Sequence, residues 1–175
     1  SSTMGKVLFG ETPYGNSMSE KSLKKIKLKD VKEFYNNYSP NISELVAVGN
    51  ISKDEFYSQL DFLKKWKNKN IIIPSNFEFP SDNTTQIYLL DKEGATQSYI
   101  MMGHKSDSYD ADGEFFKSQI MNKSLGGGAS GRLFLNLRED KGYTYGAYSF
   151  FMGEKQTGMF GIQTSVKTEA TDSAL

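Results

Sequence analysis

The chain has 175 residues, a formal net charge of +0, a single His and no Cys. This length corresponds to about one domain with a buried core, and the balanced charge argues against a general nucleic-acid or membrane-surface binder. The lack of Cys excludes disulfides and Cys-ligated metal sites, and His104 alone cannot supply the set of ligands that a catalytic zinc needs.

The two ends suggest a piece of a longer protein. Residues 1–5 are interpreted as an arm or tag, with no apolar run of signal-peptide length. Residues 171–175 are typical of the start of a helix, with Thr171 as its cap, and a domain rarely ends where a helix begins. No stretch approaches the roughly 18 apolar residues of a membrane span, so no membrane insertion is expected.

Residues 6–67 are expected to form a helix–strand–helix part. The run at 45–48 is short, apolar and closed by a Gly-Asn pair, which predicts a strand. Ser52 and Glu55 have the spacing of a capping box, which predicts a helix to about residue 66. The first helix is predicted from apolar residues spaced on one helical face, namely Val31, Phe34, Tyr35 and Tyr38.

Residues 68–85 contain two prolines and little periodicity, and we interpret them as a linker or crossing segment. Residues 86–175 are expected to form a hairpin, two helices and a second hairpin. The predicted elements are strands at 86–90 and 95–103, helices at 114–125 and 130–139 with Gly142 as C-terminal cap, and strands at 145–151 and 159–166. Strands joined by hairpins with helices between them favour one α+β domain with an antiparallel or mixed sheet packed with helices.

The segment Gly126–Gly131 matches the pattern G-x-G-x-x-G. A dinucleotide-binding fingerprint follows a strand, whereas a predicted helix precedes these glycines, and no Lys-Ser/Thr pair follows to make a P-loop. We prefer a tight turn between two helices that needs positive φ at several residues.

His104 precedes a loop that contains Asp107, Asp110 and Asp112. A metal site built from these groups is conceivable, but the same spacing is typical of solvated turns and of helix N-caps. We therefore expect no metal site in this chain.

Arg138 lies in the last turn of a predicted helix, and Tyr145 follows seven residues later at the start of a strand. On spacing alone, a surface Arg at a helix end and an aromatic strand start explain this pair equally well. The tight connection can also aim both side chains at one point, where a charged donor fork and a phenol suit a peptide carbonyl and its developing oxyanion. The other basic residues are Lys except for Arg132, which favours a directed role for Arg138.

Residues 125–146, LGGGASGRLFLNLREDKGYTYG, resemble the later signature of the pitrilysin/insulinase-type zinc peptidases, which include the mitochondrial processing peptidase. Weaker similarities at residues 12–15, 28–50 and 97–98 extend the resemblance over nearly the whole chain. The phrase at 137–146 is especially close to bacterial members.

The resemblance implies a clam-shell of two halves, each made of two related α+β domains. One half carries an inverted H-x-x-E-H zinc site, and the other supplies an Arg and a Tyr that contact the substrate near the scissile carbonyl. These roles carry over to Arg138 and Tyr145. The inverted motif is absent from this chain, so the resemblance implies a domain that is inactive alone, with zinc on a partner domain or subunit and a peptide as substrate.

The alternative is a non-catalytic structural or peptide-binding domain of the same fold, as in the core subunits of respiratory complexes. An H-x-x-E-H motif elsewhere in the protein or in a neighbouring gene would favour the peptidase. Bacterial relatives often work in the cell envelope, so the resemblance favours the periplasm or envelope over the cytoplasm.

Overall fold

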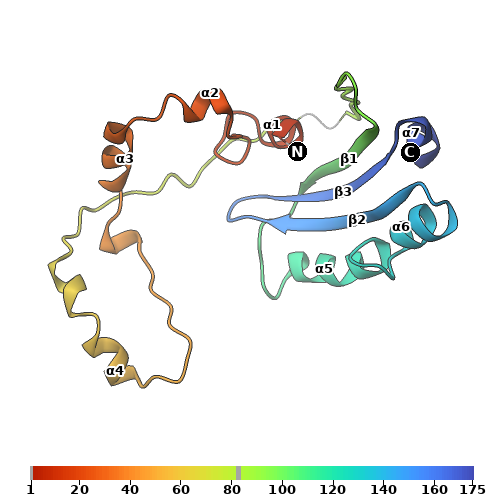
Figure 1. The fold of residues 1–175 in the computed structure, drawn as a ribbon. Coiled ribbons are helices and arrows are strands. Elements are labelled where there is room, and N and C mark those ends of the chain that lie inside the picture. Colours follow the sequence, from red (N-terminus) through yellow and green to blue (C-terminus); the bar gives the residue numbers. More distant parts are fainter. Residues whose placement is uncertain (1, 82–83) are drawn as a thin grey trace. The chain divides into compact units, whose positions relative to one another are not determined.

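The computed structural model of the chain describes residues 2–81 and 84–175 (Figure 1). Residue 1 of the expected arm and residues 82–83 of the expected linker lie outside the described residues. The described chain falls into two compact units. We call residues 18–76 the helical unit, and residues 2–17 with 77–81 and 84–175 the sheet unit.

The helical unit holds short helices, and the helix start predicted at Ser52 is confirmed. Lys27 precedes the first predicted helix, and its backbone N–H donates to the Asp30 carboxylate at 2.8 Å. The Ser52 hydroxyl accepts from the Glu55 N–H at 3.3 Å, and the Ser52 N–H donates to the Glu55 carboxylate at 3.0 Å. The helix expected to reach residue 66 is divided in two. The elements are α2 (Glu20–Leu23), α3 (Leu28–Tyr35), η1 (Pro40–Ile42), α4 (Lys53–Ser58) and η2 (Asp61–Lys65).

The strand predicted at residues 45–48 is wrong. This run is irregular, and the side chains of Val46 and Val48 are exposed. A strand needs a neighbour to satisfy its N–H and C=O groups, and none of the described residues pairs with this run. Apolar composition identified a segment suited to a strand, but it does not show whether another strand is available to pair with it.

The sheet unit contains three antiparallel strands in the order β1-β3-β2 (Figure 1). They are β1 (Gln97–Ser106), β2 (Thr144–Gly153) and β3 (Gly158–Lys167). The predicted hairpin at 145–166 is confirmed, because β2 and β3 pair directly. Together with the helices, the sheet confirms the predicted α+β class.

The first predicted hairpin is wrong. Strand β1 forms as expected, but it pairs along its whole length with β3, and residues 86–90 form no strand. The turn between them does exist, since the Ala95 N–H donates to the Lys92 carbonyl at 3.1 Å and Gly94 has φ +74°. Partner choice in a sheet follows tertiary packing rather than local pattern, and β3 offers β1 ten paired positions.

Helices run alongside β2 in the sheet unit (Figure 1). The two predicted helices are confirmed as α5 (Glu114–Leu125) and as α6 (Arg132–Phe134) continuing into η3 (Leu135–Asp140). The core between helices and sheet includes Phe115, Ala147 and Val166. The remaining elements are α1 (Ser2–Phe9), η4 (Thr168–Ala170) and α7 (Thr171–Ala174).

Helix α7 begins at Thr171 as expected, but the Thr171 side chain does not cap it. Its hydroxyl instead contacts the Thr168 carbonyl and the Ser98 hydroxyl, each at 2.7 Å. Within the described residues, every helix is too short or too polar to cross a membrane.

Candidate functional site

The glycines between α5 and α6 allow the turn to pack closely against β2. A Cβ on Gly126 would lie 2.6 Å from both the amide nitrogen and the hydroxyl of Ser149 on β2, and a Cβ on Gly131 would lie 2.9 Å from the Gly126 Cα. The expected reason for these glycines, positive φ, is wrong, because the described glycines with positive φ lie elsewhere, at Gly10, Gly94 and Gly142. Helix α5 precedes the turn, so the context of a dinucleotide-binding loop is missing.

The helix that carries Arg138 ends in a π-helical turn, η3. Gly142 follows with φ +65°, and the Tyr143 N–H donates to the Leu137 carbonyl at 3.0 Å. This confirms Gly142 as the residue that stops the helix. Single π-turns inside helices are rare and frequent at functional sites, so the position of Arg138 within one adds weight to its candidacy.

Arg138 is held by its own segment. Its guanidinium forms an ion pair of 2.7 Å with Glu139, and its guanidinium carbon lies 5.8 Å from the centroid of the Phe134 ring. The side chain keeps 43% of its surface exposed. A solvent-exposed ion pair of this kind contributes about 0–1 kcal/mol, so a ligand can replace Glu139 at little cost.

Tyr145 lies in a β-bulge at the start of β2. The pairing of β2 with β3 shifts by one residue between Thr144 and Ala147. The Thr144 hydroxyl holds the bulge, since it donates to the Gly146 carbonyl at 3.0 Å and accepts from the Gly146 N–H at 3.1 Å. A bulge re-aims a side chain, and Tyr145 is 90% exposed.

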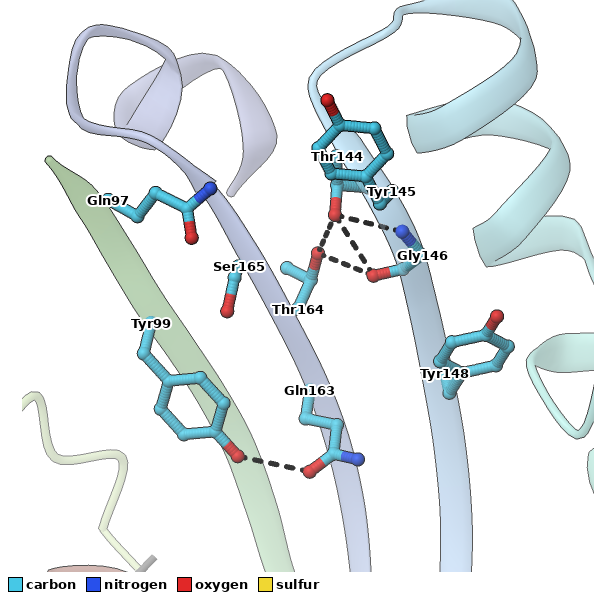
Figure 2. Close-up of a pocket in the computed structure, with 9 residues that line it drawn as sticks. All are labelled: Gln97, Tyr99, Thr144, Tyr145, Gly146, Tyr148, Gln163, Thr164 and Ser165. Carbon is cyan, nitrogen blue, oxygen red and sulfur yellow. Dashed lines mark hydrogen bonds between the residues drawn. The ribbon is translucent and has the colours of Figure 1, made fainter.

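A shallow hollow of about 380 Å³ opens on the sheet beside this bulge (Figure 2). One of its hydrogen bonds joins neighbouring strands, where the Tyr99 hydroxyl donates to the Gln163 side-chain oxygen at 3.0 Å. The residues that line the hollow come from all three strands and are all uncharged. They are Gln97, Tyr99, Thr144, Tyr145, Gly146, Tyr148, Gln163, Thr164 and Ser165.

Of the two predicted site residues, Tyr145 lines the hollow and Arg138 does not. Phe134 lies between Arg138 and the hollow. Its ring centroid is 5.8 Å from the Arg138 guanidinium carbon and 5.8 Å from the centroid of the Tyr148 ring, which lines the hollow. Sequence reasoning missed Tyr99, Tyr148 and Gln163. The alternation of side chains along each strand was visible, but the register that brings them together was not.

His104 makes contacts that are ordinary for a residue of a sheet. Its ring lies 5.2 Å from the Phe160 ring, and its Nδ1 donates to the Lys105 carbonyl at 2.7 Å. In the acidic loop, the Asp110 carboxylate accepts from the Asp112 N–H at 3.1 Å, as in a local turn. Across residues 2–81 and 84–175, no three His, Asp or Glu side chains are grouped to hold a metal.

The family model described as "Peptidase M16 inactive domain" matches residues 25–175. The chain therefore belongs to this peptidase family, as the resemblance of residues 125–146 predicted. The matched range contains Arg138, the bulge and the whole of the hollow.

Curated relatives in two bacteria carry contrasting names. The chain is 27% identical over 168 residues to a protein of Bacillus subtilis (strain 168) named "Uncharacterized zinc protease YmxG", covering 91% of this chain and 38% of that protein. It is 26% identical to the "Non-peptidase homolog YmxG" of Helicobacter pylori (strain ATCC 700392 / 26695), covering 99% of this chain and 41% of that protein. The chain thus spans about two fifths of the length of these two relatives.

Two solved structures share the fold. One is described as a peptidase M16 inactive domain from Pseudomonas fluorescens, with a TM-score of 0.82 and 24% identity over 99% of this chain and 42% of that one. The other is described as a protease from Helicobacter pylori, with a TM-score of 0.81 and 20% identity over 97% of this chain and 43% of that one. At these identities the likeness establishes the fold alone.

Proposed function

We propose that this chain is the zinc-free, substrate-contacting domain of an M16-type zinc peptidase, with the zinc held by another domain or subunit. The observation that carries the proposal is Tyr145, which is 90% exposed on a bulge that Thr144 fixes by hydrogen bonds. A tyrosine exposed in this way contributes almost no buried surface to the core. Its hydroxyl forms no hydrogen bond with any of the described residues, and the chain belongs to a peptidase family.

In this proposal the zinc of the partner domain supplies an activated water. The Tyr145 hydroxyl donates a hydrogen bond to the substrate carbonyl next to the bond that breaks, and this bond strengthens as negative charge develops on the oxygen. Arg138 adds a fixed positive charge and several N–H donors. To reach the substrate it exchanges the exposed Glu139 carboxylate for the carbonyl.

The test uses the full-length protein together with its zinc-bearing half. Removing one oxyanion donor typically lowers kcat by about 10²–10³, so Tyr145→Phe should reduce kcat by that order while KM changes little. Tyr109→Phe is the matched control, because Tyr109 lies near Gly153 at the other end of β2 and its ring packs on Phe115. An unchanged kcat in Tyr145→Phe would contradict the catalytic role.

A second candidate is a non-catalytic peptide-binding or structural domain of the same fold. The name of the Helicobacter pylori relative, "Non-peptidase homolog YmxG", favours it. The two candidates differ in the rest of the protein and its partner subunit. An H-x-x-E-H motif there, with zinc bound and peptide hydrolysed, supports the peptidase, and their absence supports the second candidate. Stoichiometric zinc bound tightly to the present chain alone would contradict the zinc-free proposal.

A further inference from the structure

The hollow beside Tyr145 is unusual for this chain in carrying no charge. At the overall 24% of charged residues, about two of its nine lining residues would be charged, and none is. Three of the nine are tyrosines, although the whole chain has ten in 175 residues. The lining of the hollow is therefore uncharged, partly aromatic and rich in hydrogen-bonding groups.

Strand register places three of these side chains, Tyr99, Gln163 and Tyr148, on one face of the sheet. Tyr99 is opposite Ser165, and Gln163 is opposite both Met101 and Tyr148. Because side chains alternate along a strand, Tyr99, Gln163 and Tyr148 share a face, while Ala147 lies on the other face and is fully buried. Figure 2 shows the Tyr99 side chain on β1 and the Gln163 side chain on β3 meeting through their hydrogen bond.

The Tyr99–Gln163 hydrogen bond leaves a usable donor and acceptor. Tyr99 donates to the Gln163 side-chain oxygen, so its own oxygen can still accept. The Gln163 amide nitrogen makes no hydrogen bond with any of the described residues, and in Figure 2 it points away from Tyr99. A neutral donor beside a neutral acceptor matches the N–H and C=O of a peptide main chain.

We propose that Tyr99 and Gln163 form a second peptide-contact point, which binds the main chain of an extended substrate and makes the hollow selective for segments with uncharged side chains. The inference rests on the proposed function, because it takes Tyr145 as the neighbouring contact. Selectivity follows because the lining of the hollow offers a charged side chain no opposite charge in return for the water that it gives up on binding. Main-chain binding is tolerant of sequence among uncharged residues.

The experiment measures binding and turnover on the full-length protein together with its zinc-bearing half. Binding is followed by fluorescence anisotropy with three fluorescein-labelled peptides of equal length, one uncharged, one with several Asp and one with several Lys. Gln163→Glu keeps an oxygen for the Tyr99 hydroxyl and adds one negative charge to the hollow. Gln156→Glu adds the same charge in the loop between β2 and β3, at the other end of these strands.

The wild type should bind the uncharged peptide most tightly. Gln163→Glu should shift the ratio of Kd values toward the Lys peptide by about fivefold to tenfold, because a charge at about 4 Å in a wet site has that effect. Tyr99→Phe removes one neutral hydrogen bond and should raise KM or Kd by about threefold to tenfold at unchanged kcat. Gln156→Glu should leave the preference as in the wild type.

Equal binding of the three peptides by the wild type, no binding of any of them, or the same shift in Gln156→Glu and Gln163→Glu would overturn the inference. These outcomes are separate from failure of the catalytic proposal. If Gln163→Glu shifts the charge preference but the protein cleaves no peptide, the second peptide-contact point is supported and the peptidase activity is rejected. If Tyr145→Phe lowers kcat but Gln163→Glu leaves the charge preference of peptide binding unchanged, the peptidase activity is supported and the second contact point is rejected.

Discussion

The Ser149 N–H on β2 donates a hydrogen bond of 3.0 Å to the carbonyl oxygen of Gly126 in the turn after α5. This bond brings the turn against the strand so closely that a side chain on Gly126 would meet Ser149. The glycine-rich segment is thereby explained by close approach of two backbones, with no nucleotide required.

Gly126→Ala should destabilise the fold by about 1–3 kcal/mol, because the added methyl group forces the turn away from β2. Gly128→Ala is the matched control, since a Cβ at Gly128 meets nothing within 4 Å. It should be neutral or slightly stabilising. Urea unfolding followed by circular dichroism measures both variants, and equal stability of the two would contradict the packing explanation.

A buried polar pair fastens α5 to β2 next to this turn. The Asn122 amide donates to the Ser149 carbonyl at 2.8 Å, and the Ser149 hydroxyl donates to the Asn122 side-chain oxygen. Asn122→Ala leaves both Ser149 groups short of a partner and should lower the free energy of unfolding by about 1–3 kcal/mol.

The control for that loss is Asn136→Ala, at an exposed position of η3. It should change stability by less than about 0.5 kcal/mol. Urea midpoints at an unchanged denaturant slope provide the comparison. A loss in Asn122→Ala no larger than that of Asn136→Ala would show that the buried pair does not fasten the helix.

The sequence predicted correctly those features that depend on interactions between residues close together in the chain. The capping box at Ser52, the helix of α5 and the glycine that ends η3 all depend on residues within a few positions of each other. Pairing of β1 with β3 depends instead on residues about 60 positions apart. Residues 86–90 have the apolar and aromatic composition of a strand, but nothing in the local sequence showed that β3 is the partner of β1.

The same division applies to the candidate site. Tyr145 could be named as a candidate from the sequence because it lies in one continuous segment with Arg138 and the glycine turn. Tyr99 and Gln163 are 64 residues apart, and only the register of β1 on β3 makes them neighbours. The bulge was also unpredictable from Tyr145 itself, since the Thr144 hydroxyl that fixes it resembles any other strand threonine.

Acid should weaken the start of α4. Hydrogen bonds from the Ser52 hydroxyl and from the Ser52 N–H lower the pKa of Glu55 below its usual value. A lowered pKa in the folded state means that the stabilisation is present above the usual Glu pKa and is lost as pH falls through the lowered one. Ser52→Ala should move the pKa of Glu55 back toward its usual value.

The measurement is an NMR titration of the Glu55 side-chain carboxyl carbon. Ser58→Ala is the control, because the Ser58 hydroxyl donates to the Glu55 backbone carbonyl at 2.7 Å and leaves the carboxylate alone. It should leave the pKa of Glu55 unchanged. A titration curve that is the same in wild type and Ser52→Ala would contradict the capping explanation.

Thr144 should act as a positioning residue for Tyr145. Its hydroxyl bonds both backbone groups of Gly146 and lies 3.0 Å from the Thr164 hydroxyl. Thr144→Val keeps the shape of the side chain but removes these hydrogen bonds. The bulge is then less rigid, and the Tyr145 side chain is no longer held in one orientation. Since a misplacement of about 1 Å can cost 10²-fold, kcat in the full-length protein with its zinc-bearing half should fall about tenfold to hundredfold.

Thr144→Ser retains the hydroxyl and should restore kcat to near the wild-type value, which a purely structural role for the methyl group would not do. Combining Thr144→Val with Tyr145→Phe should cost little more than Tyr145→Phe alone, because the positioning residue acts through the tyrosine. Fully additive losses in the double variant would mean that Thr144 serves catalysis by another route. A kcat unaffected by Thr144→Val would mean that the bulge does not aim Tyr145.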